Sequence, residues 1–315
     1  EDRAGRPSDY AEREQEVSEQ APHDPSDCPF CAGHEKQTPP TLAEVDDAEG
    51  NWRVRVIPNK YPAVVEADSG KGTQAPLHDA PRQPPYGSHE VIIESPEHLG
   101  DLTDLTREHL ITVMSVYRDR VRHHLHQGTA RHVSLFKNVG YAAGASLEHV
   151  HSQLVALPFV PPVLETELAS SQRHYQEHDS CLFCDLLAEE LENGVRLVAE
   201  REHFVAFAAI AGRQPFETWI VPKAHAAGFS AVTDVQLIEM AELLQQLLAG
   251  LRQHLKPLSY NLLLHTSPAG DQHEDSYHWH WELVPRTAQL AGFEWSSGLY
   301  INALAPERAA TLLRQ

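Results

Sequence analysis

The chain has 315 residues, of which 41 % are hydrophobic, so it can fold as one large domain or as two of ordinary size. Its formal net charge of −20 argues against a general nucleic-acid-binding protein, whose affinity comes largely from Lys and Arg side chains that neutralise phosphates. No apolar run approaches the roughly 20 residues of a membrane-spanning helix, and the N-terminal residues do not resemble a signal or transit peptide. We therefore expect a cytoplasmic protein with neither a membrane nor a nucleic acid as its partner.

The first half of the chain contains a Cys-x-x-Cys pair, Cys28 and Cys31, and a Gly- and Pro-rich stretch at 67–86 that predicts a long loop. The expected regular elements are a strand at 52–57, a strand at 89–94, a helix from about 102 to Gly128, a strand at 132–138 and a strand from His149 onward. Side chains two apart on a strand share one face, so His149, His151 and Gln153 should point to the same side. A polar, solvated strand face is the alternative interpretation of this pattern.

The second half of the chain repeats this order. After Cys181 and Cys184, the expected elements are strands at 195–199, 203–209 and 217–221, a helix at 232–254, a strand at 260–265 and a strand at 277–284. Each half therefore contains Cys-x-x-Cys, strands, Pro-x-x-His, a helix, a strand and a His-x-His strand. Such a repeat predicts an α+β fold of two similar units, 1–165 and 166–315, each an antiparallel sheet with helices, related by a pseudo-twofold axis.

The repeat also aligns two sets of metal ligands. Without a secretion signal, paired thiols at this spacing are more often metal ligands than disulfides, and a thioredoxin-type redox pair is the alternative. The predicted Cys₂His₂ sets are Cys28, Cys31, His98 and His149 in the first half, and Cys181, Cys184, His225 and His278 in the second. Closed four-ligand zinc sites are structural, because a catalytic zinc needs an open position.

With His149 assigned to a metal, His151 is left for chemistry on the same strand face. Neutral imidazole is a nucleophile near neutral pH, and its attack on the α-phosphorus of a nucleotide gives a phosphoramidate that a second phosphate acceptor can cleave. Gln153 could hydrogen bond a non-bridging oxygen of that phosphoryl group. The loop around Gly144 and Ser146 could add main-chain N–H groups and a hydroxyl without net positive charge.

The motif Gly-x-Ser-x-x-His-x-His-x-Gln at 144–153, with Cys-Pro-Phe-Cys, Asn-Lys-Tyr-Pro, Ser-Pro-Glu-His and Phe-Lys-Asn upstream, resembles the galactose-1-phosphate uridylyltransferase family of the histidine-triad superfamily. The resemblance runs from Arg3 to about Leu313 and implies two histidine-triad-like units in a homodimer. It implies a ping-pong reaction in which UDP-glucose gives a uridylyl-histidine, and galactose 1-phosphate then takes the uridylyl group. The residues that it implies are His151 as nucleophile, Gln153 at the phosphate, Asn59 by the nucleoside, Asn138 and Ser146 by the phosphates, and Arg3 and Arg6 as a phosphate-binding pair.

Several positions depart from the best-studied members of this family. Glu148 and Val150 stand where those members have Pro residues. Some members carry an iron site of one Glu and three His, and the residues near the matching positions are Glu167, His265, His278 and His280. Because His278 also completes the second Cys₂His₂ set, we favour zinc there. Segment 291–302 lacks the Tyr-Glu and Gln pattern that grips the hexose and is more similar to the branch that includes ADP-glucose phosphorylase, in which inorganic phosphate accepts an adenylyl group.

We therefore predict a zinc-containing nucleotidylyltransferase with a covalent nucleotidyl-histidine, most simply one that performs the uridylyl transfer of galactose metabolism. An NDP-sugar phosphorylase of the same mechanism is the alternative, so the expected ligands are a nucleotide sugar and either a sugar phosphate or phosphate. Two hypotheses from other functional classes are a nonenzymatic, zinc-stabilised binding module and a nucleotide hydrolase that uses water as the acceptor. The second half fits a binding module, because His280 and Glu282 replace the catalytic His-plus-Gln pair.

Overall fold

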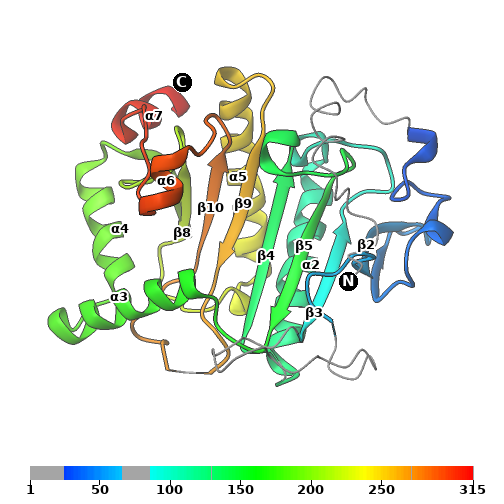
Figure 1. The fold of residues 1–315 in the computed structure, drawn as a ribbon, viewed down its shortest axis with the longest axis horizontal. Coiled ribbons are helices and arrows are strands. Elements are labelled where there is room, and N and C mark those ends of the chain that lie inside the picture. The colour runs from blue at the N-terminus through cyan, green and yellow to red at the C-terminus, as the bar shows by residue number, and fades with distance from the viewer. Residues whose placement is uncertain (1–24, 66–85, 129, 271, 315) are drawn as a thin grey trace.

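The computed structural model describes residues 25–65, 86–128, 130–270 and 272–314 (Figure 1). Arg3, Arg6 and all but the last residue of the predicted loop at 67–86 lie outside these ranges. The described strands are β1 Ala43–Asp46, β2 Trp52–Pro58, β3 Ser88–Ile93, β4 His132–Val139, β5 His151–Leu157, β6 Leu197–Glu200, β7 Phe204–Ala208, β8 Thr218–Pro222, β9 Tyr260–His265 and β10 His280–Pro285. All the predicted strands are present, with ends that differ by three residues or fewer.

These strands form one antiparallel sheet in the order β1-β2-β3-β5-β4-β9-β10-β8-β7-β6. Read inward from either edge, each half has the same order: first, second, third, fifth, fourth strand. The halves join where β4 pairs with β9 in antiparallel register, with Asn138 opposite Asn261. This arrangement confirms the α+β fold and the repeat of two antiparallel units. The division expected between residues 165 and 166 falls within helix α3, Pro162–His178.

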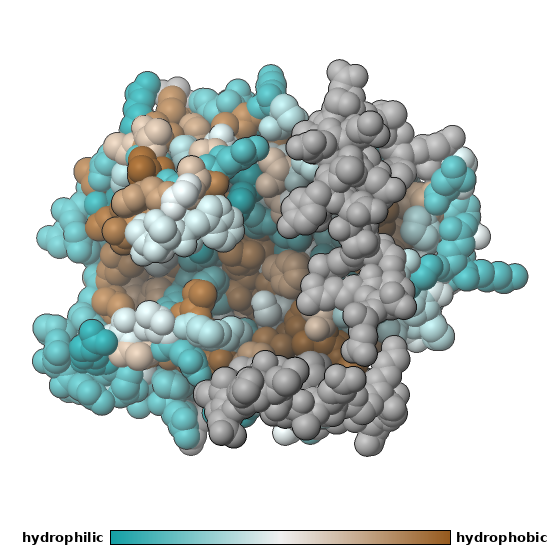
Figure 2. Space-filling model, in the orientation of Figure 1, coloured by the Kyte–Doolittle hydropathy of each residue, from teal (hydrophilic) through white to brown (hydrophobic). Residues whose placement is uncertain are grey.

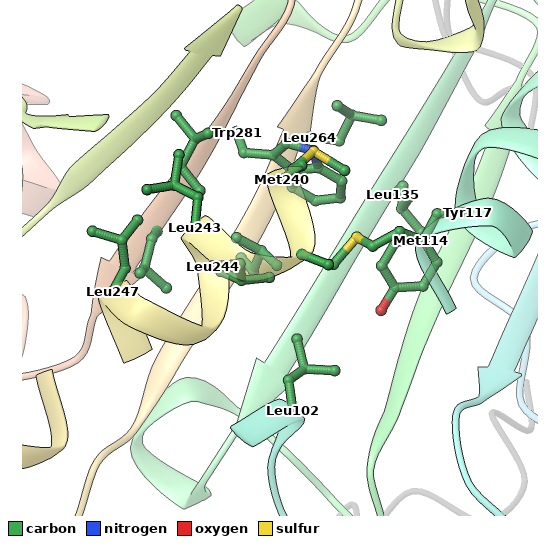
Figure 3. Close-up of a cluster of buried hydrophobic side chains, with 14 of the residues drawn as sticks. Leu102, Met114, Tyr117, Leu135, Met240, Leu243, Leu244, Leu247, Leu264 and Trp281 are labelled. Atoms are coloured by element: carbon green, nitrogen blue, oxygen red, sulfur yellow. The ribbon is translucent and has the colours of Figure 1, made fainter. Parts of the chain in front are cut away.

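Two long helices, α2 Arg107–His126 and α5 Asp234–His254, lie side by side on one face of the sheet (Figure 1). Their apolar sides and the adjacent sheet face form the main core, in which Met114 and Tyr117 of α2 meet Met240 and Leu244 of α5 (Figure 3). Leucine and methionine at helical spacing produce this stripe, and Thr106 and Thr233 cap the two N-termini.

The predicted helix start near residue 102 is wrong. Asp101 accepts hydrogen bonds from the N–H and hydroxyl of Thr103 and forms a capping box with Asp104, which begins a short 3₁₀ turn at Leu102–Asp104. Leu105 is then extended, and Thr106 caps the true α-helix. Leu102 and Leu105 are nevertheless buried, so their apolar spacing reflects core packing and not a continuous helix.

The remaining helices are α3, α4 Leu182–Asn193, α6 Gly292–Ser297 and α7 Pro306–Leu313. Of these, α3 and α6 lie on the sheet face turned toward the viewer, and hydrophobic residues lie between them (Figures 1 and 2). The sequence patterns did not predict α3, because it buries only Leu164, Leu168 and Ser171 and its apolar stripe is thin. No helix among the described residues has the length and apolar content needed to cross a bilayer.

Candidate active site and metal clusters

His151 is the first residue of β5, His149 precedes the strand, and their side chains face the same side of the sheet. The strand begins at His151, two residues later than expected, yet both imidazoles pack edge-on against Phe30, with ring centroids 5.9 and 5.4 Å away. Val150, between them, points into the helix-side core and is 2 % exposed. Its N–H donates to the Leu99 carbonyl at 2.7 Å, a bond that Pro could not make. Val150 is therefore suited to this backbone.

The His151 ring is held so that Nε2 carries the lone pair. Nδ1 lies 2.7 Å from the carbonyl oxygen of His149, and because a carbonyl only accepts, Nδ1 must carry the proton. Burial, and then the positive charge of Lys137, lowers the pKa of His151, so the ring is neutral at neutral pH. A neutral imidazole with Nε2 unprotonated is the form that can attack phosphorus.

Lys137, at the end of β4, ties the nucleophile's backbone to a buried carboxylate. Its Nζ donates to Glu94 Oε2 at 2.6 Å and to the His151 carbonyl at 2.8 Å, and both charged side chains are 2 % exposed or less. Glu94 also accepts a hydrogen bond from Ser152 Oγ at 2.5 Å. This network lies on the opposite face of β5 from His151 and fixes the strand beneath the site.

We expect Lys137→Met to lower the free energy of unfolding by about 3–5 kcal/mol, because Glu94 would be left as an uncompensated buried charge. Urea denaturation measures this change. The matched double variant Lys137→Met/Glu94→Gln should recover part of the loss, since it removes both charges. A loss below about 1 kcal/mol in the single variant would show that water reaches Glu94 and would refute the network's structural role.

A cavity of about 710 Å³ opens beside His151 and is lined by His151 and two predicted phosphate contacts, Asn138 and Ser146, as well as by the predicted metal ligands His98 and His149. The second half of the chain contributes Arg252 and Lys256 to the same cavity. Asn138 is positioned across the junction of the two halves, because its Oδ1 accepts from Asn261 Nδ2 at 2.8 Å.

Gln153 and Asn59 form a group that adjoins the cavity. Gln153 follows His151 by two residues on β5 and faces the same side of the sheet. Asn59 Nδ2 lies 3.4 Å from Gln153 Oε1, so the two predicted residues are in contact. His89 of β3, which the sequence patterns did not single out, lies between them with Nε2 3.0 Å from Gln153 Oε1. His89 and Val91 are two residues apart on β3 and therefore share this face. The pairing of β3 with β5 is what brings His89 to Gln153.

The ligand atoms of the first predicted metal set converge. One atom each of Cys28, Cys31, His98 and His149 lies within 4.8 Å of the others. His149 Nδ1 is 3.4 Å from Cys28 Sγ, and its Nε2 is 2.8 Å from the Ser95 carbonyl, which holds the ring as metal-bound histidines are commonly held. Burial lowers the pKa of His149 to about 4, which keeps the ring neutral and able to bind a cation.

The second predicted set converges in the same way. Cys181, Cys184, His225 and His278 also bring their ligand atoms within 4.8 Å of one another. His225 Nε2 lies 2.7 Å from the Glu274 carbonyl, as His149 does from Ser95. Burial and the charge of Cys181 raise the pKa of Cys184 to about 12, so this thiol keeps its proton until a bound cation displaces it. Both clusters could bind a metal.

The alternative ligand set for iron is divided between two clusters. His278 Nδ1 lies 3.5 Å from Cys184 Sγ, whereas Glu167, His265 and His280 form a separate cluster. His265 bridges two carboxylates, with Nδ1 2.9 Å from Glu167 and Nε2 3.2 Å from Glu282. Burial lowers the pKa of His265, but the bonds to both carboxylates outweigh it and raise the pKa to about 10. Glu167, His265 and His280 could still hold a cation by themselves, but the fourth residue of the iron set, His278, has its Nδ1 in the Cys184 cluster.

The second half repeats the packing of the site but has a carboxylate where the first half has an amide. Phe183 packs against His280, with ring centroids 4.8 Å apart, as Phe30 does against His151. Glu282 occupies the position of Gln153 and is ion-paired with Arg213 and His265. A carboxylate at this position repels a phosphate, whereas an amide can donate a hydrogen bond to one.

Comparisons with known proteins agree over nearly the whole chain. Residues 1–161 match the family model "Galactose-1-phosphate uridyl transferase, N-terminal domain", and residues 86–313 match a domain of unknown function, DUF4921. ADP-glucose phosphorylase of Arabidopsis thaliana is 34 % identical over 99 % of this chain and 88 % of its own length. A galactose-1-phosphate uridylyltransferase of Thermotoga maritima is 27 % identical over 73 % of this chain and 74 % of its own.

Solved structures of similar fold come from the same two kinds of enzyme. The crystal structure of an Arabidopsis thaliana ADP-glucose phosphorylase with bound ADP-glucose superposes with a TM-score of 0.82 at 33 % identity, covering 94 % of this chain and 92 % of that one. A uridylyltransferase structure superposes with a TM-score of 0.76 at 30 % identity, covering 87 % of this chain and 90 % of that one.

Proposed function

The chain belongs to the galactose-1-phosphate uridylyltransferase family of nucleotidyltransferases, and from this we propose that it transfers a nucleotidyl group from a nucleotide sugar through a covalent bond to His151. The observation that carries the proposal is the orientation of His151, whose Nδ1 is fixed on the His149 carbonyl beside a cavity of about 710 Å³. That volume accommodates a small-molecule ligand.

In the first half-reaction, His151 Nε2 attacks the α-phosphorus, an N–P bond forms, and the P–O bond to the sugar phosphate breaks. The sugar 1-phosphate leaves with the bonding electron pair. In the second half-reaction, an oxygen of the acceptor phosphate attacks the same phosphorus and His151 leaves with its electron pair restored. The Gln153 amide, the Asn138 amide and the Ser146 hydroxyl donate hydrogen bonds to the phosphoryl oxygens while negative charge builds up on them.

We propose Zn²⁺ as the metal of both Cys₂His₂ sets, because two thiolates and two imidazoles favour tetrahedral zinc. A zinc bound by Cys28 and Cys31 would fix the loop that carries Phe30, which packs against His151. Its contribution would be structural, and the chain's own residues would perform the transfer.

The donor that we favour is ADP-glucose, with inorganic phosphate as the acceptor. Similarity to the Arabidopsis thaliana ADP-glucose phosphorylase extends over 99 % of the chain at 34 % identity, and segment 291–302 lacks the hexose-gripping pattern of the uridylyltransferases. Uridylyl transfer from UDP-glucose to galactose 1-phosphate is the second candidate, supported by the family model and by relatives such as that of Thermotoga maritima.

We expect ADP-glucose with phosphate to give kcat/KM at least about tenfold higher than UDP-glucose with galactose 1-phosphate, because one base pocket discriminates between a purine and a pyrimidine. Release of glucose 1-phosphate, followed with each donor and acceptor pair, measures this ratio. The opposite ratio would favour the uridylyltransferase. Steady formation of nucleoside monophosphate without any acceptor would instead identify a hydrolase, and the absence of labelling by either donor would favour a binding module.

We further propose a homodimer. The segment around α6 exposes large apolar side chains, with Phe293 51 %, Trp295 74 % and Leu299 63 % exposed. Apolar groups gathered in one short segment are typical of a surface covered by another protein chain. The resemblance to the family implies that C-terminal residues complete the neighbouring subunit's sugar pocket, and this supports the proposal.

A further inference from the structure

His89, the second residue of β3, contacts both Gln153 and the segment that follows β2. Its ring is 7 % exposed, and its Nε2 lies 3.0 Å from Gln153 Oε1 and 3.1 Å from Asn59 Nδ2. Its Nδ1 accepts a hydrogen bond from the Ala63 N–H at 3.0 Å. One imidazole therefore contacts Gln153, the expected phosphate contact, and lies beside Asn59, the expected nucleoside contact.

The Ala63 N–H fixes the tautomer of His89. Because a backbone N–H only donates, Nδ1 must carry its lone pair, and the proton of the neutral ring is on Nε2. Nε2–H then points at Gln153 Oε1, an acceptor. Asn59 Nδ2 is a second donor 3.4 Å from the same oxygen.

Two donors on Oε1 determine which way the Gln153 amide faces. An amide can rotate by half a turn about its last side-chain bond, and its oxygen and nitrogen then exchange places. If the oxygen faced a phosphate, two acceptors would meet and repel each other. With Oε1 engaged by His89 and Asn59, the NH₂ group is the end left to donate to a phosphoryl oxygen.

The backbone strengthens this arrangement. The Asn59 N–H donates to the His89 carbonyl at 2.7 Å, and Asn59 Oδ1 accepts from the Tyr61 N–H at 2.8 Å. The Asn59 side chain is therefore fixed with Nδ2 toward Gln153. The end of β2, the start of β3 and the middle of β5 form one hydrogen-bonded unit at this point.

We propose that His89 is a positioning residue that orients the Gln153 amide toward the transferred phosphoryl group, an inference that rests on the proposed nucleotidyl transfer. His89 does not touch the reacting atoms in this proposal. It acts through Gln153, and its main-chain carbonyl, which accepts from the Asn59 N–H, links it to the expected nucleoside contact.

The test compares His89→Leu, His89→Gln, Gln153→Ala and the double variant His89→Leu/Gln153→Ala in the full chain. The readout is the single-turnover rate of nucleotidyl-enzyme formation with ADP-glucose and with UDP-glucose. We expect His89→Leu to slow this step by roughly 10–100-fold, close to the effect of Gln153→Ala, because one charge-stabilising donor is lost in each. The double variant should be no slower than Gln153→Ala alone, since His89 has no effect without its partner.

His89→Gln should remain within about fivefold of the wild type, because its amide can donate to Gln153 and accept from Ala63. The matched control is His132→Leu, which removes another buried histidine on the same sheet face of β4 and should leave the rate within about twofold. Multiplying effects in the double variant, or equal slowing by His132→Leu, would overturn the positioning role.

Two further outcomes separate this proposal from the proposed function. If neither donor labels the wild type, the nucleotidyl transfer itself is refuted, and the role of His89 in it falls too. ¹⁵N NMR of histidine-labelled protein needs no substrate and reports the tautomer of His89, assigned by its loss in His89→Gln. A proton on Nε2 is expected, and a proton on Nδ1 would overturn the positioning role even where the wild type is labelled.

Discussion

His151→Ala is expected to abolish formation of the nucleotidyl-enzyme, with a rate loss on the order of 10⁴-fold or more, as for other residues that supply the attacking atom. Nδ1 of His151 is committed to the His149 carbonyl, so Nε2 presents the lone pair at the edge of the cavity. Alanine removes that atom and leaves no nitrogen in its place. Rapid-quench labelling with nucleotide-radiolabelled ADP-glucose and UDP-glucose measures the loss, and the melting temperature shows whether the variant still folds.

His280→Gln is the matched control, because His280 has the same place in the second half that His151 has in the first. Glu167 and Glu282 place negative charge near His280, which would repel a phosphate, and we expect labelling to stay within a few-fold of the wild type. Labelled His151→Ala protein, with the nucleotide mapped by proteolysis to another residue, would show that His151 is not the nucleophile. Equal losses in both variants would indicate that folding, and not chemistry, had failed.

The repeated motifs of the sequence predicted much of this fold, because local patterns determine single elements. Alternating hydrophobic and polar residues predicted the strands, and Thr106 and Thr233 cap the long helices. The two Cys-x-x-Cys pairs and their histidines were aligned from the sequence repeat alone, and their ligand atoms converge in the structure. The junction of the halves is different. Pairing of β4 with β9 joins residues that no local pattern connects, such as Asn138 and Asn261.

In the site too, local sequence patterns predicted some residues, and long-range contacts define the others. His151 and Gln153 were predicted from one short motif, whereas His89 was not, because its role depends on the register of β3 against β5 and on the return of the chain at Ala63. Lys137 lies in the Phe-Lys-Asn motif, but its bond to the His151 carbonyl is visible only when β4 and β5 are paired. Residues that act through others are defined by contacts, and contacts far apart in sequence leave little local signal.

Cys28→Ser is expected to cost the protein one equivalent of zinc and to lower the melting temperature by at least roughly 10 °C. Structural zinc contributes about 10–16 kcal/mol of apparent binding free energy, and a loss of about 5 kcal/mol already corresponds to a shift of this size at about 2–4 °C per kcal/mol. Few apolar contacts can replace the metal, because the small cluster around the loop includes only Cys28, Phe30 and neighbours from β2 and β3 among its buried members. Metal analysis and thermal denaturation measure both quantities.

Cys184→Ser is the matched variant for the second cluster, and comparing the two separates structural support from support of the nucleophile. Both should lose one equivalent of zinc, but only Cys28→Ser should also slow nucleotidyl-enzyme formation at a temperature at which it is still folded. The reason is the contact of Phe30 with His151, the proposed nucleophile, with ring centroids 5.4 Å apart. In the second half, Phe183 makes the corresponding contact with His280, to which we assign no chemical step. Unchanged zinc content in Cys28→Ser would refute the first ligand set, and equal slowing by both variants would show that the first metal has no special relation to His151.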